Sequence, residues 1–428
     1  MIYGDVSEEY SRVWDYAEAI RRFNPGSTAI VKCIGIDTPP PLFQRMYICL
    51  LACKEGFVAD CRPIIGVDGA HLKGQFPGVL LTAVGKDGNN NIFPVAWAVV
   101  ETENVETWTW FLNLLVEDLR SVTASSSWVQ AEGEAFTFMS DRQKGLVEAL
   151  NSVIPGLEIR FCCRHIWANF KIKFPGELFK QHFWRAARAY NKFHFDREMN
   201  EIKNISVEAY EYLAAIPTKH WSRHAFCSRS KSGMLLNNNC EAFNNVLVEA
   251  RGKPIISLME WIRRYVMQRS AAKREGLSNF EGILCKHALA CIVLRKLDAN
   301  DFVHEAYLVE TYQKTYSPKF YGMPGHKMWP TTTLAKPLPP PYRKMPGRPN
   351  KRKRKKEADE GKGGHYKKGC KNPPKPPPTK IKSKGGRPKM GSSSTQQSTT
   401  NDVLSSISQQ QTQNAASTSC VMDQNSQI

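Results

Sequence analysis

The chain has 428 residues, of which 42% are hydrophobic, and this is enough for two domains with a substantial packed core and a tail. Its net charge of +19 is placed unevenly, because residues 336–390 hold 20 Lys and Arg against three Asp and Glu, while residues 1–335 carry only +4. Lys and Arg bind phosphates by displacing counterions, so the basic tail predicts nucleic acid as a partner.

The cysteines and the apolar runs argue against two other classes of protein. The 12 cysteines are irregularly spaced in a long chain with no N-terminal signal pattern, which disfavours a small secreted disulfide framework and favours a reducing compartment. The longest apolar run near the start, Met46 to Cys53, is far shorter than the roughly 20 residues of a membrane-spanning helix. We therefore expect no association with a membrane.

Residues 1–60 are predicted to form a helical lead-in. Between Glu8 and Arg22 apolar and aromatic residues recur at helical spacing, and an Asn-Pro-Gly stop follows at Asn24. Next come three predicted strands in a meander, over 64–67, 79–84 and 92–100. The last two are joined by Lys86 to Asn90, whose Gly and Asn tolerate the positive φ angles of a hairpin turn.

The predicted order continues with a helix, a strand, a helix and a strand, over 106–119, 135–140, 143–153 and 158–162. This order is that of a ribonuclease-H-like core, an α/β fold whose sheet mixes antiparallel and parallel strands. We expect the domain to span residues 61–268, with an aromatic-rich helical insertion over about 165–236. Two further helices are predicted over 240–251 and 254–268.

The last part of the chain has a different composition. After about residue 330 it is rich in Pro, Lys and Arg, and from Ser392 it is rich in Ser, Gln and Thr. Neither composition can bury enough surface to fold. We therefore expect residues 331–428 to be a disordered tail.

Two aspartates follow predicted strands that are neighbours in such a sheet. Asp68 ends the first strand and Asp141 ends the fourth, so their carboxylates should face each other at one sheet edge. Mg²⁺ and Mn²⁺ prefer oxygen ligands, and a pair of these ions can clamp the attacking and leaving oxygens of a phosphodiester. Glu241, which follows asparagines that can cap a helix, is the candidate for a third ligand. Taken singly, each acid is better explained as a turn or cap residue, and only their joint placement favours a metal site.

Three stretches resemble the acidic blocks of the Mutator-like element (MULE) transposases of plants. They are Ile65 to Gly74, Met139 to Gly145 and Asn237 to Asn245, and they occur in the family's order. The resemblance runs from about Asp5 to Trp329. It implies a ribonuclease-H-like fold in which the three acids named above form a catalytic, metal-binding triad. It also implies hydrolysis of DNA at the ends of an element, followed by strand transfer.

Two Cys-His motifs belong to the same resemblance. Cys162 and His165 match a Cys-x-x-His motif that follows the second acid in the family. They could bind metal, or they could be a buried thiol and a histidine bonded to backbone. Cys285 and His287 resemble the second half of a SWIM-type zinc finger, which assigns residues 269–330 to a partial finger. A complete finger adds a Cys-x-Cys to supply four zinc ligands, and this sequence contains none.

The basic tail contains two Gly-Arg-Pro tripeptides, around Arg348 and Arg387, that resemble AT-hooks. Pro keeps the backbone extended and Gly permits close approach, so each Arg could enter the narrow minor groove of A·T tracts. The alternative is a solvated basic linker. The run Lys351 to Lys356 is a candidate nuclear-import signal, which predicts a nuclear protein.

The sequence leaves three functions open. The leading hypothesis is a transposase that cuts DNA and transfers strands with Mg²⁺ or Mn²⁺, with DNA and a second copy of the chain as partners. The second is a nuclear DNA-binding protein without catalytic activity, in which the same fold survives for structural reasons. The third is an RNA-binding protein or ribonuclease, because the core fold is shared with enzymes that act on RNA.

Overall fold

The computed structural model of the chain describes residues 6–123, 136–227, 230, 232–275, 286–296 and 309–341. By its internal contacts the chain divides into two units, Met1–Arg348 and Pro349–Ile428, and every described residue belongs to the first. Within the described ranges, no helix is long and apolar enough to cross a membrane.

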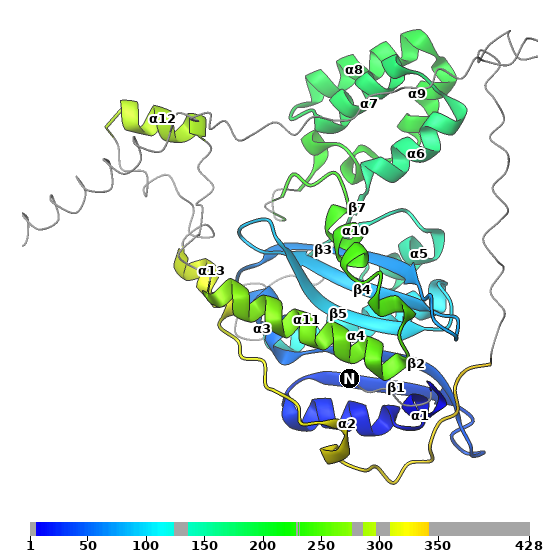
Figure 1. Ribbon diagram of the computed structural model, residues 1–428. Coiled ribbons are helices and arrows are strands. Elements are labelled where there is room, and N and C mark those ends of the chain that lie inside the picture. The colour runs from blue at the N-terminus through cyan, green and yellow to red at the C-terminus, as the bar shows by residue number, and fades with distance from the viewer. Residues whose placement is uncertain are drawn as a thin grey trace, which may run out of the picture. The chain divides into compact units, whose positions relative to one another are not determined.

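A seven-stranded mixed sheet lies at the centre of the first unit (Figure 1). Its strands are β1 Thr28–Ile34, β2 Leu42–Cys49, β3 Arg62–His71, β4 Val79–Lys86, β5 Ile92–Val100, β6 Thr137–Ser140 and β7 Glu158–Phe161. They lie in the order β1-β2-β5-β4-β3-β6-β7. The first five strands in this order pair antiparallel, whereas β6 runs parallel to β3 and β7 runs parallel to β6.

The sheet is accompanied by helices before, between and after its strands. They are α1 Val6–Ser11, α2 Val13–Phe23, α3 Leu51–Asp60, α4 Val105–Thr123, α5 Lys144–Val153, α6 Cys163–Lys173, α7 Glu177–Arg188, α8 Lys192–Ile205, α9 Val207–Ala214, α10 Asn238–Val246, α11 Ile255–Glu275, α12 Lys286–Leu294 and α13 Val309–Tyr316. From β3 to β7 the elements follow the predicted order of three strands, helix, strand, helix and strand.

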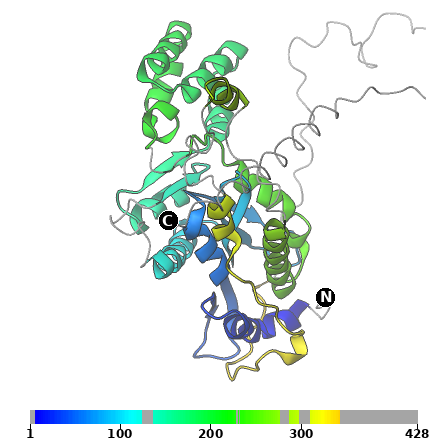
Figure 2. The same ribbon diagram turned by 90° about the vertical axis from the view of Figure 1, so that its left-hand side faces the viewer.

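Apolar side chains pack on both faces of the sheet. One cluster joins the sheet to α4 and α5, and it buries Trp108 and Phe111 completely. The other joins it to α2, α10 and α11, through residues such as Phe243 and Ile262. Central strands therefore bury successive side chains on opposite faces, as Leu80 and Leu81 do in β4. The sheet lies between two helical layers (Figure 2).

The lead-in differs from the helical segment that we predicted. Besides α1, α2 and α3 it contains β1 and β2, which extend the sheet beyond β5. β1 alternates in burial, with Ala29, Val31 and Cys33 facing inward, and β2 is buried along most of its length. The sequence of β1 does not show this alternation clearly, because Ile30 and the exposed Ile34 lie on its outer side, so periodicity did not predict the strand.

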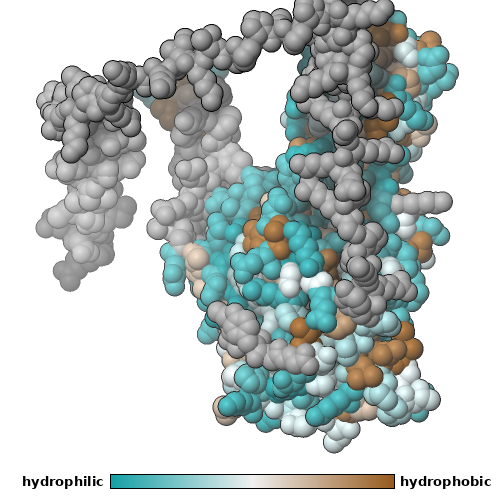
Figure 3. Space-filling model, turned by 45° about the vertical axis from the view of Figure 1, so that its right-hand side comes forward, coloured by the Kyte–Doolittle hydropathy of each residue, from teal (hydrophilic) through white to brown (hydrophobic). Residues whose placement is uncertain are grey.

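Along the chain, helices α6 to α9 lie between β7 and α10, where the helical insertion was expected. Aromatic rings fill its interior, and the rings of Phe183 and Trp221 stack with centroids 5.5 Å apart. Some apolar side chains of the insertion, such as Ile172 and Phe193, are exposed. On the face of the molecule shown in Figure 3, hydrophobic groups form separate patches among hydrophilic ones.

Ordered chain continues beyond the boundary that we expected at residue 331. The backbone N–H of Thr332 donates to Asp15 Oδ1 at 2.8 Å, and Leu338 forms a parallel bridge with Leu42 next to β2. Upstream, Trp329 packs against Tyr16 of α2 with ring centroids 5.1 Å apart. Specific contacts with the lead-in hold this Pro-rich segment, which composition alone does not reveal.

The place of β2 in the sheet gives a test of the unpredicted strands. Ile48 is fully buried and pairs with Trp97 of β5. Ile48→Ala should lower the free energy of unfolding by about 2–5 kcal/mol, because it leaves a cavity in the core. Denaturant unfolding measures this loss. Lys32→Ala, on the exposed side of β1, is the control and should change stability by less than about 0.5 kcal/mol. Equal effects of the two substitutions would contradict the packing described.

Candidate metal-binding acidic site

The parallel pairing of β3 and β6 places two of the three predicted acids side by side. The register pairs Ile64 with Thr137 and Gly66 with Met139. Two residues further on, the same register leads to Asp68 in β3 and to Asp141 directly after β6. We predicted that this strand ends at Asp68. In the structure β3 continues to His71, because it still pairs with β4.

Hydrogen bonds fix the orientation of both carboxylates. Asp68 Oδ1 accepts the backbone N–H of Gly69 at 3.0 Å, and its Oδ2 accepts Nδ2 of Asn244 at 2.8 Å. Asp141 Oδ1 accepts the N–H of Gln143 at 3.1 Å, across Arg142, whose φ is 70°. The left-handed conformation at this non-glycine position is uncommon and turns the chain sharply before α5.

The environment of Asp68 disfavours its charged form. Burial raises its pKa to about 7, and the negative charges of Asp141 and Glu103 act in the same direction. The hydrogen bonds from Gly69 and Asn244 oppose the rise only in part. A carboxyl group in this situation binds a cation strongly, because the cation removes the repulsion that burial has made costly.

Glu103, which was not predicted from the sequence, also lies beside the aspartates. Its carboxylate accepts Nε1–H of Trp108 at 3.2 Å. A Cβ atom added at Gly69 would lie 2.9 Å from its Cδ, so only glycine at position 69 leaves room for it there. Burial, and then the charge of Asp141, raise the pKa of Glu103.

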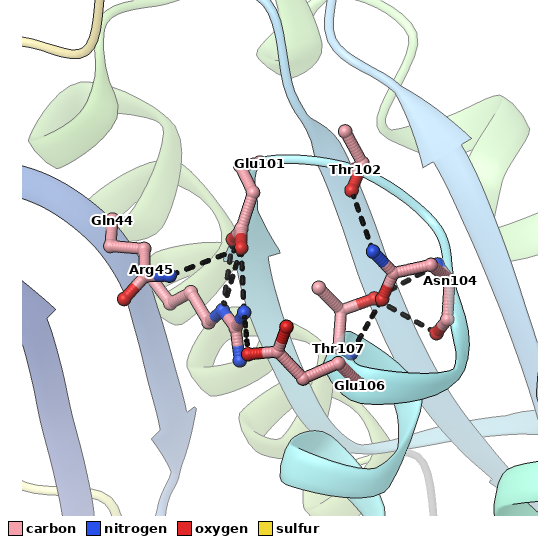
Figure 4. A network of polar contacts seen from close by, with 7 residues as sticks. All are labelled: Gln44, Arg45, Glu101, Thr102, Asn104, Glu106 and Thr107. Carbon is pink, nitrogen blue, oxygen red and sulfur yellow. Dashed lines mark hydrogen bonds and ion pairs between the residues drawn. The ribbon is translucent and has the colours of Figure 1, made fainter.

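Glu103 lies in the loop between β5 and α4, where the residues around it form a network of polar contacts (Figure 4). Arg45 of β2 is almost fully buried and bonds both Glu101 and Glu106, each with an N–O distance of 2.6 Å. Within the loop, Asn104 Oδ1 accepts the N–H of Thr107 at 2.9 Å, and Thr107 Oγ1 accepts the N–H of Asn104 at 3.1 Å. This reciprocal cap starts α4 two residues after Glu103.

One sequence signal could have identified Glu103. β5 and β3 both pair antiparallel with β4, so they run in the same direction and end at the same edge of the sheet. An acid soon after β5 therefore falls near the aspartates that follow the other strands. The predicted meander already implies this order, so Glu103 could have been identified from the sequence.

Glu241 lies in a different environment from the one predicted for it. It occupies the first turn of α10, as expected, but its carboxylate forms an ion pair with Arg164 of α6. It also lies next to Cys162 and His165, so that one ligand atom from each of the three residues lies within 4.8 Å of the others. On the same helix, Asn244 reaches Asp68. Helix α10 thus connects the aspartate pair with a second group of metal-ligating side chains.

The donor atoms around the aspartates suit a hard divalent cation. Asp68, Asp141 and Glu103 supply carboxylate oxygens, the ligands that Mg²⁺ and Mn²⁺ prefer. Oδ1 of Asn244, beside Asp68, is buried without a hydrogen-bond partner among the described residues. Arg251 lies near Asp68. Burial lowers the pKa of the Arg251 guanidinium, and the negative charge of Asp68 opposes this effect. Arg251 adds a positive charge at the edge of the site.

The other residues expected to bind metal or DNA are not placed by the structure. Cys285 lies outside the described residues, and so do Arg348 and Arg387. His287 lies in α12, but its side chain is not described. The predictions of a partial zinc finger and of AT-hooks therefore stay predictions.

The raised pKa of Asp68 predicts a pH dependence of stability. In the unfolded chain an aspartate has a pKa of about 3.9. The folded protein holds the proton up to about pH 7, so the stability contributed by this group is complete below the unfolded pKa and is lost as pH rises through the folded one. Without divalent metal, Asp68→Asn should therefore gain stability relative to wild type between about pH 5 and about pH 8.

Denaturant unfolding at several pH values measures this gain. The charges of Asp141, Glu103 and Arg251 also act at this site, so none of these residues can serve as a control. Glu117→Gln, which removes an exposed acid of α4, is the control. Parallel pH profiles for wild type and Asp68→Asn would show that Asp68 ionises normally.

Comparison with models of known protein families matches part of the chain. Residues 64–169 match the family model of the MULE transposase domain. The matched range contains Asp68, Glu103 and Asp141, as well as Cys162 and His165, whereas Glu241 lies beyond it. No curated protein matches the chain. The match supports a relationship of this α/β domain to the MULE transposase family.

Proposed function

We propose that the protein is a MULE-type DNA transposase, or derives from one, and that it catalyses metal-dependent phosphodiester hydrolysis and strand transfer on DNA. The observation that carries the proposal is the in-register placement of Asp68, within β3, and Asp141, directly after the parallel strand β6. The order of strands and helices from β3 to β7 supports a ribonuclease-H-like fold.

The chemistry follows from the donor set. Mg²⁺ or Mn²⁺ bound at this site would lower the pKa of an attacking water and stabilise the leaving oxygen of the scissile phosphodiester. Asp68 and Asp141 would hold the metal, and Asn244 keeps the Asp68 carboxylate oriented. Arg251 could neutralise a phosphate oxygen, since its guanidinium is anchored on the backbone oxygen of His71 at 3.2 Å.

Two residues compete for the role of the third carboxylate. The resemblance to the family assigns it to Glu241. The electrostatics favour Glu103, because its charge raises the pKa of Asp68 and the charge of Asp141 raises its own pKa, whereas Glu241 is paired with Arg164. We propose that Glu103 is the third acid, beside Asp68 and Asp141. Glu241 is retained as the alternative, and the experiment below distinguishes the two.

Substitution of the acids tests the catalytic proposal. Asp68→Asn and Asp141→Asn should each reduce Mn²⁺-dependent cleavage of element-end DNA by at least about 100-fold, because loss of residues even in the outer shell of metal sites has effects up to that size. Glu103→Gln should cause a comparable loss, and Glu241→Gln a smaller one. The measurements are gel-based cleavage and strand-transfer assays.

The outcomes separate the possible assignments. Glu117→Gln is a matched control, since it removes an exposed acid of α4 that is not one of the acids of the site. If Glu241→Gln abolished cleavage while Glu103→Gln did not, the third acid would be Glu241. If the wild-type chain bound DNA without cleaving it, the alternative of a catalytically inactive DNA-binding protein would hold.

The basic tail supports a DNA-binding role under either alternative. Its excess of Lys and Arg between residues 336 and 390 suits phosphate binding, and we propose that its Gly-Arg-Pro motifs enter the minor groove of A·T-rich DNA. We also propose that the run Lys351 to Lys356 directs the protein to the nucleus.

A double substitution tests the tail. Arg348→Ala/Arg387→Ala should weaken binding to A·T-rich duplexes by more than binding to G·C-rich duplexes, because only the narrow groove receives the Arg side chains. Fluorescence anisotropy at fixed salt measures both affinities. The matched control, Arg352→Ala/Arg354→Ala, removes the same charge outside the Gly-Arg-Pro motifs and should weaken binding to both duplexes equally. The same A·T preference in both double variants would contradict the minor-groove assignment.

A further inference from the structure

A second group of metal-ligating side chains lies where the helical insertion begins. Cys162 precedes the first residue of α6, His165 lies in its first turn, and Glu241 lies in the first turn of α10. Their ligand atoms all lie within 4.8 Å of one another. A separation of this size suits ligands around one ion, since atoms bound at about 2.0–2.3 Å from a tetrahedral centre lie less than 4 Å apart and small movements close the rest.

The state of each side chain agrees with such a role. The Cys162 side chain is fully buried, and its sulfur accepts the backbone N–H of Asn237 at 3.3 Å. Nδ1 of His165 is buried and has no hydrogen-bond partner among the described residues. The Glu241 carboxylate already faces a cation, the guanidinium of Arg164. Because the side chain of Arg164 is half exposed, it can move into solvent without loss of core packing.

The donor set selects the type of metal. A thiolate and an imidazole are poor ligands for Mg²⁺ but good ligands for Zn²⁺, and a carboxylate is an accepted third ligand. A thiolate and a carboxylate together carry two negative charges, which one Zn²⁺ neutralises. A site of this composition therefore differs in chemistry from the all-oxygen site at Asp68 and Asp141.

We propose that Cys162, His165 and Glu241 bind one zinc ion, with water in the fourth tetrahedral position. The ion joins the N-terminus of α6 to the first turn of α10, the helix that also orients Asp68 through Asn244. Zinc at this position would couple the helical insertion to the acidic site. It also gives Glu241 a role outside the aspartate pair. The proposal does not depend on cleavage activity, because it concerns metal retention alone.

Metal content and cobalt spectra test the proposal in the full-length chain. The parent protein carries Cys285→Ser and His287→Asn, so that the partial finger cannot contribute. We expect it to purify with about one equivalent of zinc. After replacement by Co²⁺ it should show a sulfur-to-cobalt charge-transfer band and the d–d intensity of a tetrahedral site. Cys162→Ser, His165→Asn and Glu241→Gln should each lower the zinc content, and Cys162→Ser should abolish the charge-transfer band.

Two control variants separate metal binding from structural damage. Cys163 is adjacent and equally buried, but its sulfur donates to the backbone oxygen of Trp221 at 3.2 Å, so Cys163→Ser should keep zinc and the cobalt band. Arg164→Gln breaks the ion pair with Glu241 without removing a ligand, and it should also keep zinc. Circular dichroism shows whether each variant is folded.

The proposal is overturned by either of two results. One is a zinc content and cobalt band in Cys162→Ser equal to those of the parent. The other is equal loss in Cys163→Ser and Cys162→Ser, which would locate the metal elsewhere or attribute its loss to unfolding. If Cys162→Ser does not fold, His165→Asn and Glu241→Gln decide, since both residues lie only partly buried. Unchanged zinc in these two variants contradicts the site.

Discussion

The arrangement of the site depends on one constraint, the repulsion between the carboxylates of Asp68, within β3, and Asp141, directly after β6. Parallel pairing brings Asp68 and Asp141 into register, and Glu103 adds a third charge from the loop after β5. Folding therefore has to hold together groups that would separate in water. Buried packing on both faces of the sheet supplies the stability that this requires, while burial and then the charge of Asp141 raise the pKa of Asp68.

Each carboxylate is held by a different part of the fold. Asp68 is fixed within a strand and by Asn244 of α10, and Asp141 by the turn before α5. Arg45, a buried arginine of β2, bonds Glu101 and Glu106, which lie on either side of Glu103 in the sequence (Figure 4). Because β2 belongs to the unpredicted part of the sheet, the lead-in is not an accessory to the domain. Its Arg45 bonds the loop that contains Glu103.

The sequence was sufficient for the parts of the structure that depend on neighbouring residues. Strand and helix periodicity predicted β3 to β7. The expectation that Asp68 and Asp141 lie on neighbouring strands is confirmed by the pairing of β3 with β6. The errors arose where pairing is remote along the chain. β1 was missed because Ile30 and Ile34 lie on its more exposed side, which hides the alternation in the sequence. Glu103 was missed although the predicted meander implies that β3 and β5 end at the same edge. Glu241 was placed on the correct helix, but periodicity does not reveal that Arg164 faces it.

The helical insertion begins and ends at almost the same point. The N–H of Cys163, at its start, donates to the backbone oxygen of Leu235, near its end, at 2.7 Å, and the N–H of Asn237 reaches the sulfur of Cys162. A segment closed at its base in this way can change in length or sequence while the strands and helix on either side keep their positions. Evolution can therefore enlarge, shorten or replace the insertion as a module, so long as the few residues that close it are retained.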